Sequence, residues 1–168
     1  MSPIGQPALV VSDRPLGGPN FTATCLIGIG DNPILVDIRT GSNTAQDFCT
    51  YITVALAMNF FQRGDILVYD NAAVHFARDT WQELSIALDR AGVDYIPLPT
   101  YSPELNPIER CFGVVKNYMR YHLDEEESLL NNILEGFSKV TSEIVAIEYQ
   151  STVAFASKCG PLQNPFVE

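Results

Sequence analysis

Two short apolar runs, separated by a helical pattern, constrain the fold of this chain more than any other feature. The first run, Ile66–Tyr69, shows no polar alternation and ends on Asp70. The second run, Val93–Leu98, follows an amphipathic pattern over Arg78–Arg90. A strand, a helix and another strand in this order are typical of an α/β fold. Because the first run lacks polar alternation, we expect that strand to be buried on both faces.

The residues before these runs predict a β-hairpin and a helix. Phe21–Ile29 and Ile34–Arg39 are rich in apolar and β-branched residues, and an Asp-Asn-Pro turn separates them. Ala45–Phe61 then predicts a helix, after a Gly41–Thr44 segment whose side chains can cap it. The apolar residues of this helix recur every four positions: Phe48, Ile52, Leu56 and Phe60.

The residues after these runs are predicted to be mainly helical. Asn106 is a favoured cap residue, and Pro107 suits the first position of a helix. One face of this helix is apolar: Ile108, Cys111, Phe112, Val115, Met119 and His122. Another face carries Glu109, Gly113, Lys116 and Arg120. A last helical segment is predicted over Ser128–Ala156.

This order of elements predicts an α/β fold with a mixed sheet flanked by helices. A ribonuclease-H-like arrangement fits the order, as other α/β folds do. We expect one domain over residues 14–157. Before it, residues 1–13 are expected to be loose or to form a short strand over Ala8–Ser12, and residues 158–168 are expected to be a loose tail.

Composition narrows the functional classes. The chain has 168 residues, enough for one domain with an ordinary hydrophobic core. Its net charge of −10 at pH 7 argues against a large basic surface for nucleic acid. Four widely spaced cysteines argue against a zinc site or a disulfide framework. No run is apolar over the length of a membrane span and no secretory signal is found, so we expect a soluble, intracellular protein.

Asp70 has two interpretations, because it lies at the end of a predicted strand. An Asp-Asn pair after a strand is common turn chemistry, in which the side chain bonds to the nearby backbone. Alternatively, open α/β sheets bind ligands at the carboxyl ends of their strands, where Asp70 lies. His75 follows in the sequence and is either a surface histidine or a residue of the same cleft.

Glu109 also has two interpretations. Its spacing from Asn106 matches a capping box, in which the glutamate accepts the N–H of the cap residue. Alternatively, its carboxylate points into a cleft, and Lys116 and Arg120 on the same face contact phosphates. A solvated helix face is the simpler explanation of the two basic residues. Prolines in the preceding Leu98–Pro107 segment stiffen the connection, which helps to hold a carboxylate at a metal.

Taken together, these segments resemble the catalytic domain of DDE transposases of the mariner type. The resemblance rests on YDNAAVH at Tyr69–His75, LPTYSPELNPIE at Leu98–Glu109 and VVK at Val114–Lys116. It extends over residues 14–120, with a further likeness at Thr44–Tyr51. The resemblance implies a ribonuclease-H-like fold that cleaves and transfers DNA strands in transposition with two Mg²⁺ (or Mn²⁺) ions.

The resemblance also implies roles for single residues. Asp70 and Glu109 would be the catalytic, metal-binding carboxylates. Supporting positions are Asn71, His75, Asn106 and Pro107, and the contacts to DNA phosphates are Lys116 and Arg120. DNA is the implied partner, the nucleus the implied location in a eukaryote, and a homodimer stays open alongside a monomer.

The chain departs from this family near its N-terminus. The strand that carries the first catalytic aspartate is not found before the hairpin, and neither is a helix-turn-helix, so an N-terminally truncated copy is expected. Asp13, after the apolar run Ala8–Ser12, is a candidate replacement for that aspartate. The alternative is an inactive transposase remnant that acts, if at all, as a protein-interaction module.

Overall fold

The computed structural model describes residues 20–30, 33–70, 78–122 and 128–159. The predictions for Asp13, Asn71, His75 and residues 160–168 therefore lie outside the described residues. The elements are β1 (Phe21–Ile27), β2 (Ile34–Thr40), α1 (Ala45–Ala57), β3 (Ile66–Tyr69), α2 (Arg78–Ala91), β4 (Asp94–Pro97), the 3-10 turn η2 (Pro103–Leu105), α3 (Pro107–His122), α4 (Leu129–Ser138) and α5 (Ser142–Ala156). The predicted α/β class is confirmed.

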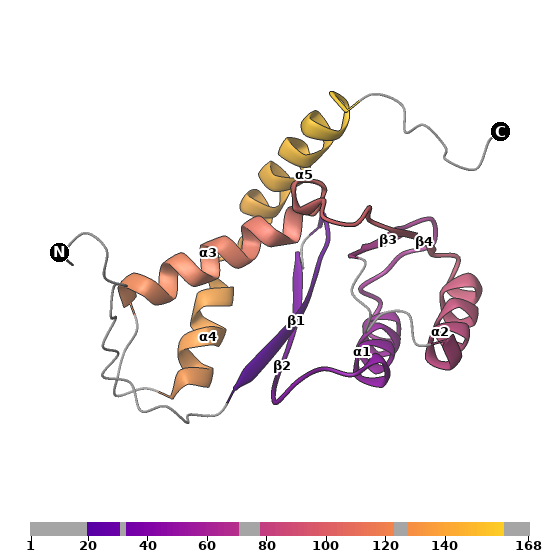
Figure 1. Cartoon of the computed structure of the whole chain (residues 1–168), viewed down its shortest axis with the longest axis horizontal. Coiled ribbons are helices and arrows are strands. Elements are labelled where there is room, and N and C mark those ends of the chain that lie inside the picture. Colours follow the sequence, from indigo (N-terminus) through magenta and orange to yellow (C-terminus); the bar gives the residue numbers. More distant parts are fainter. Residues whose placement is uncertain (1–19, 31–32, 71–77, 123–127, 160–168) are drawn as a thin grey trace, which may run out of the picture.

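The strands form two ladders in the described part of the chain (Figure 1). β1 and β2 pair antiparallel, with Phe21 opposite Thr40. β3 and β4 pair parallel, with Ile66 opposite Asp94. The antiparallel and parallel parts of the expected mixed sheet are thus both present, but no ladder joins β1 to β3.

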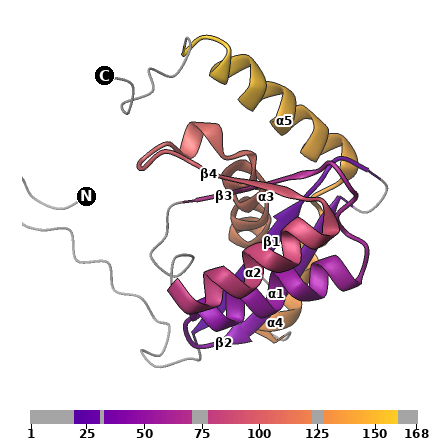
Figure 2. The same cartoon turned by 90° about the vertical axis from the view of Figure 1, so that its right-hand side faces the viewer.

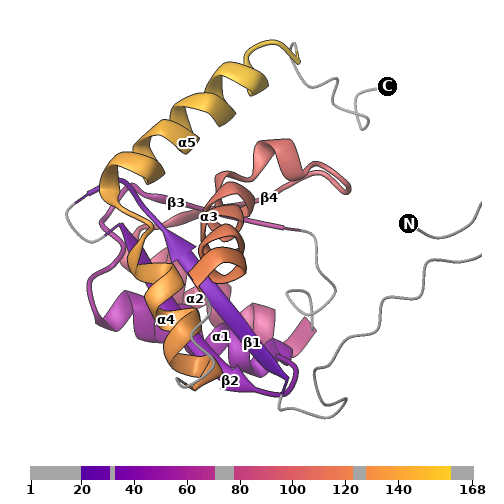
Figure 3. The ribbon, with the colours of Figure 1, turned by 90° about the vertical axis from the view of Figure 1, so that its left-hand side faces the viewer.

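Two hydrophobic clusters hold the helices against the strands. In the first, α1 and α2 pack on one face of β3–β4 and on Leu26 and Leu35 of the hairpin. In the second, α3, α4 and α5 cover the other face of the hairpin, which includes Cys25 and Val36. Figure 1 shows the hairpin between these two groups of helices, and Figures 2 and 3 show each group from its own side. The hairpin is therefore the layer that both clusters share.

The prediction that Ile66–Tyr69 is buried on both faces is wrong. Leu67 and Tyr69 are buried, whereas Ile66 is 51% and Val68 48% exposed. The reason is that α1 and α2 cover only one face of this ladder, and side chains of a strand alternate between faces. The apolar side chains on the second face therefore contact solvent in the described structure.

The first helix starts as predicted but ends earlier. Thr44 and Asp47 form a complete capping box, which confirms the predicted cap. The helix ends at Ala57, and Asn59 has a positive φ of 55° that a helix cannot accommodate. Phe60 therefore lies beyond the helix, and the predicted stripe loses its last member.

The C-terminal helical region also differs from the prediction. Ser128–Ala156 is divided into α4 and α5 rather than forming one segment. Thr141 separates them, because its hydroxyl accepts the N–H of Ile144 at 3.4 Å and starts a new helix. On α3, His122 is exposed and stacks on Tyr118 with ring centroids 4.6 Å apart, so it does not belong to the apolar face.

The four cysteines are free thiols, in agreement with the absence of a predicted disulfide framework. Burial raises the pKa of Cys25 to about 12 and, with Glu148 nearby, that of Cys111 to about 11. Both thiols are therefore protonated and poor nucleophiles at neutral pH. Among the described helices, none combines the length and the apolar character needed to cross a membrane.

Candidate active-site groove

The position of Asp70 is set by the strand that it follows. Tyr69 is buried against Trp81, with ring centroids 5.1 Å apart. Because successive side chains along a strand point to opposite faces, Asp70 points away from this aromatic cluster, and it is exposed. The carbonyl of Tyr69 accepts the N–H of Leu98 at 2.7 Å. This bond joins the end of β3 to the loop that leads to α3.

The position of Glu109 is set by Asn106, which connects η2 to α3. The side-chain oxygen of Asn106 accepts the N–H of Ile108 at 3.3 Å. The N–H of Asn106 donates to the carbonyl of Pro103 at 3.0 Å. The reciprocal half of a capping box is therefore not formed, since the N–H that Glu109 would accept is bonded to Pro103. Within the described residues the exposed Glu109 carboxylate makes no hydrogen bond or ion pair.

Asp70 and Glu109 line one groove of about 380 Å³. The other lining residues are Asn106 and the loop residues Leu98, Pro99, Thr100, Tyr101, Ser102 and Pro103. Thus the structure brings together both predicted carboxylates, although residues 71–108 separate them in the sequence. Pro107, which was predicted to support the site, is buried in the first turn of α3 and does not line the groove.

A comparison with protein families agrees with this geometry. The family model of the DDE superfamily endonucleases matches residues 26–130, more than half of the chain. This chain belongs to the DDE superfamily endonucleases. The match includes both Asp70 and Glu109, so the groove of this DDE endonuclease domain lies inside the family region. A search of curated proteins found no match.

The carboxylate and amide oxygens of the groove suit a hard divalent cation such as Mg²⁺. Asp70, Glu109 and Asn106 supply such oxygens from three different points of the chain. In the ranges that the structure describes, no three His, Cys, Asp or Glu side chains gather into a metal-binding group. The residues present therefore fit part of a metal site. Asp13, the candidate third acid, lies outside these ranges.

The two basic residues predicted to contact DNA lie along α3 from the groove. Lys116 and Arg120 are exposed on the same helix face as Glu109, as the spacing predicted. Neither lines the groove. Lys116 follows Glu109 by about two turns, which places it about 10 Å along the helix axis. Such an arrangement can meet a phosphate several atoms away from the one at the groove.

Tyr101 is a groove residue that sequence reasoning missed. Its side chain is 97% exposed, and its φ of 58° lies in the left-handed region that non-glycine residues rarely adopt. Such backbone strain is typical of ligand-binding positions. The sequence gives no signal for it, because a tyrosine between Thr100 and Ser102 looks like any other loop residue.

Proposed function

We propose that this groove is the active site of a transposase-derived DDE endonuclease of the mariner type, which cuts and joins DNA strands with Mg²⁺. The observation that carries the proposal is the convergence of Asp70 and Glu109 in one groove. A strand end supplies the first carboxylate and the start of a helix supplies the second. Membership of the DDE superfamily supports the same chemistry.

In this proposal Asp70 and Glu109 hold the divalent cation, and Asp13 completes the set of acids. The metal, when bound, polarises a phosphate oxygen and lowers the pKa of a bound water or 3′-hydroxyl. The chain's own contribution is to hold these carboxylates in place. Asn106 does so by capping α3 next to Glu109, and the bond from Leu98 to Tyr69 does so at the end of β3.

A second candidate function, a protein-interaction module without catalysis, is favoured by one observation. The chain carries a net charge of −10, whereas phosphate contacts dominate the affinity of proteins for DNA. Lys116 and Arg120 would have to provide local attraction against this overall charge. An inactive domain has no such requirement.

Calorimetric titration with Mn²⁺ separates the two candidates. We expect binding to the unmodified protein and its loss in Asp70→Asn and Glu109→Gln. Glu104→Gln is the matched control, because this exposed acid lies on the adjacent η2 and does not line the groove. Weakened binding in Asp13→Asn would support the third acid. If the unmodified protein binds no Mn²⁺ and does not nick DNA, the enzymatic proposal is wrong and the interaction module remains.

A further inference from the structure

One edge of β1 has no partner strand in the described part of the chain. The N–H of Gly28 donates to the carbonyl of Pro33 at 2.9 Å, which marks a hydrogen-bonded pair of the hairpin. Such pairs alternate along an antiparallel ladder. The backbone groups of Ala23 and Cys25 therefore point away from β2, toward the edge that no described strand occupies.

β3 has a similar edge. The carbonyls of Asp65 and Tyr69 accept the N–H groups of Asp94 and Leu98 at 2.9 and 2.7 Å. Odd-numbered residues of β3 thus face β4, and the backbone groups of Ile66 and Val68 face away from it. No described strand pairs with this edge either. We call these two edges, with the cavity between their ends, the strand slot.

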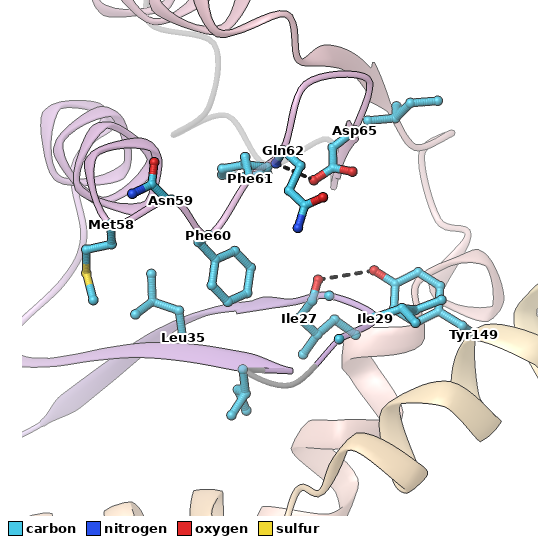
Figure 4. A pocket seen from close by; sticks show the side chains of 14 residues that line it. Ile27, Ile29, Leu35, Met58, Asn59, Phe60, Phe61, Gln62, Asp65 and Tyr149 are labelled. Carbon is cyan, nitrogen blue, oxygen red and sulfur yellow. Dashed lines mark hydrogen bonds between the residues drawn. The ribbon is translucent and has the colours of Figure 1, made fainter.

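The cavity shows how the two edges lie relative to each other. It has a volume of about 740 Å³ and is lined by the end of β1 (Ile27), the start of β3 (Ile66), and Phe60 and Tyr149 between them. In Figure 4 the ring of Phe60 points across the cavity toward the hairpin, and the Tyr149 hydroxyl contacts the carbonyl of Ile27. β1 therefore runs toward this cavity, and β3 runs away from it.

We propose that residues Ala8–Ser12 of this chain occupy the strand slot as a β-strand, antiparallel to β1 and parallel to β3. These residues, Ala-Leu-Val-Val-Ser, lie outside the described ranges and are apolar at four of five positions. A strand buried on both faces has such a run. The slot offers apolar neighbours on both sides, since the two faces of the hairpin belong to different clusters.

The connection to β1 fits this direction. Residues 13–20 join the segment to Phe21, and they include two prolines and two glycines, which favour a turn. A strand that enters β1 through a turn must run opposite to β1, hence away from the cavity and alongside β3. A short tether also raises the effective concentration of the segment to the millimolar range. Covalent connection thus favours this occupant over a separate peptide.

This direction has a consequence for the groove. The segment would end where β1 begins and β3 ends, so Asp13 would emerge at the same end as Asp70. Only this consequence rests on the proposed function, in which Asp13 is the third acid. The occupation of the slot itself depends on the two edges and the cavity.

Nuclear magnetic resonance of the full chain tests the occupation. We expect nuclear Overhauser effects between residues 8–12 and both Ala23 and Val68. We also expect at least tenfold slower amide exchange at Ala23, Cys25, Ile66 and Val68 than in Val10→Pro, which removes an N–H from the inserted strand. Gln6→Pro is the matched control, because it places a proline outside the strand and should leave exchange unchanged.

Three results would overturn the proposal. The first is fast exchange at these amides and no such Overhauser effects in the unmodified protein, which needs no variant to fold. The second is exchange that is slow in both proline variants, since another element then protects the edges. The third is protection that vanishes on dilution, because the occupant is then a second copy. Loss of Mn²⁺ binding in Asp70→Asn leaves all these readouts unchanged, so the strand slot and the proposed function fail separately.

Discussion

The N–H of Asn106 donates to the carbonyl of Pro103 at 3.0 Å, and this bond takes the place of a bond to the Glu109 carboxylate. The cap of α3 therefore depends on Asn106 and not on Glu109. Glu109 lies in the first turn, faces the groove and has no bonded partner among the described residues. This separation of structural and functional groups leads to the first prediction.

Asn106→Ala should lower the free energy of unfolding by about 1 kcal/mol, because the N–H of Ile108 loses its acceptor. Glu109→Gln should change it by less than about 0.5 kcal/mol, as is usual for exposed positions. Urea denaturation measures both values. An equal loss in the two variants would show that the glutamate carboxylate does belong to the cap.

The two glycines inside helices should respond in opposite directions to substitution by alanine. A Cβ at Gly113 meets nothing within 4 Å, whereas at Gly136 it meets Cγ1 of Val115 at 2.9 Å. Gly113→Ala should therefore stabilise the protein by about 0.5–1 kcal/mol through helix propensity. Gly136→Ala should destabilise it by about 1–3 kcal/mol, because α3 and α4 must move apart. Thermal unfolding of both variants checks this contrast.

Tyr149→Phe should lower the free energy of unfolding by about 1 kcal/mol. The Tyr149 hydroxyl donates to the carbonyl of Ile27 at 3.1 Å, and burial raises the pKa of this hydroxyl. Tyr118→Phe is the control, because its bond to Glu135 is at the surface, where water can replace it. Denaturation curves that give the control the larger loss would contradict this role of Tyr149.

Asp47 should make the stability sensitive to acid. The hydroxyl and the N–H of Thr44 donate to its carboxylate, and with Arg39 beside it they hold its pKa below the ordinary value of 3.8. A carboxyl with a depressed folded pKa contributes stability above its unfolded pKa, which is lost as pH falls through the folded pKa. Melting temperatures from pH 6 to pH 2 should therefore fall less steeply in Asp47→Asn than in the exposed control Asp89→Asn.

Tyr101→Asn should weaken the binding of single-stranded DNA without loss of stability. Asparagine tolerates a positive φ better than tyrosine does, so the strained backbone is retained at lower cost. Stacking of a base on an aromatic ring is worth about 1 kcal/mol or more, roughly a fivefold change in affinity. Fluorescence anisotropy with a labelled oligonucleotide measures it. Tyr121→Asn, which removes an exposed ring that does not line the groove, should leave the affinity unchanged.

Local sequence patterns were sufficient to predict most elements. Ile66–Tyr69 was predicted with its observed bounds, and Thr44 was predicted within the segment that caps α1. Such features depend on neighbouring residues, whose steric and hydrogen-bonding preferences act over a few positions. The same reasoning named Asp70 and Glu109 as a pair, but only through the length of the combined motif, because each alone had an adequate structural explanation.

Only the tertiary structure decided which surfaces are covered and which groups meet. Val68 is apolar and was predicted to be buried, yet it is exposed because no described helix lies on that face of β3. Glu109 could have closed a capping box, but the 3-10 turn before it bonds the N–H of Asn106 to Pro103 instead. Burial and competition for a donor depend on residues far apart in the chain. The sequence alone determined the acids of the groove, and the packing of β3 against α2 and the turn before α3 brought them together.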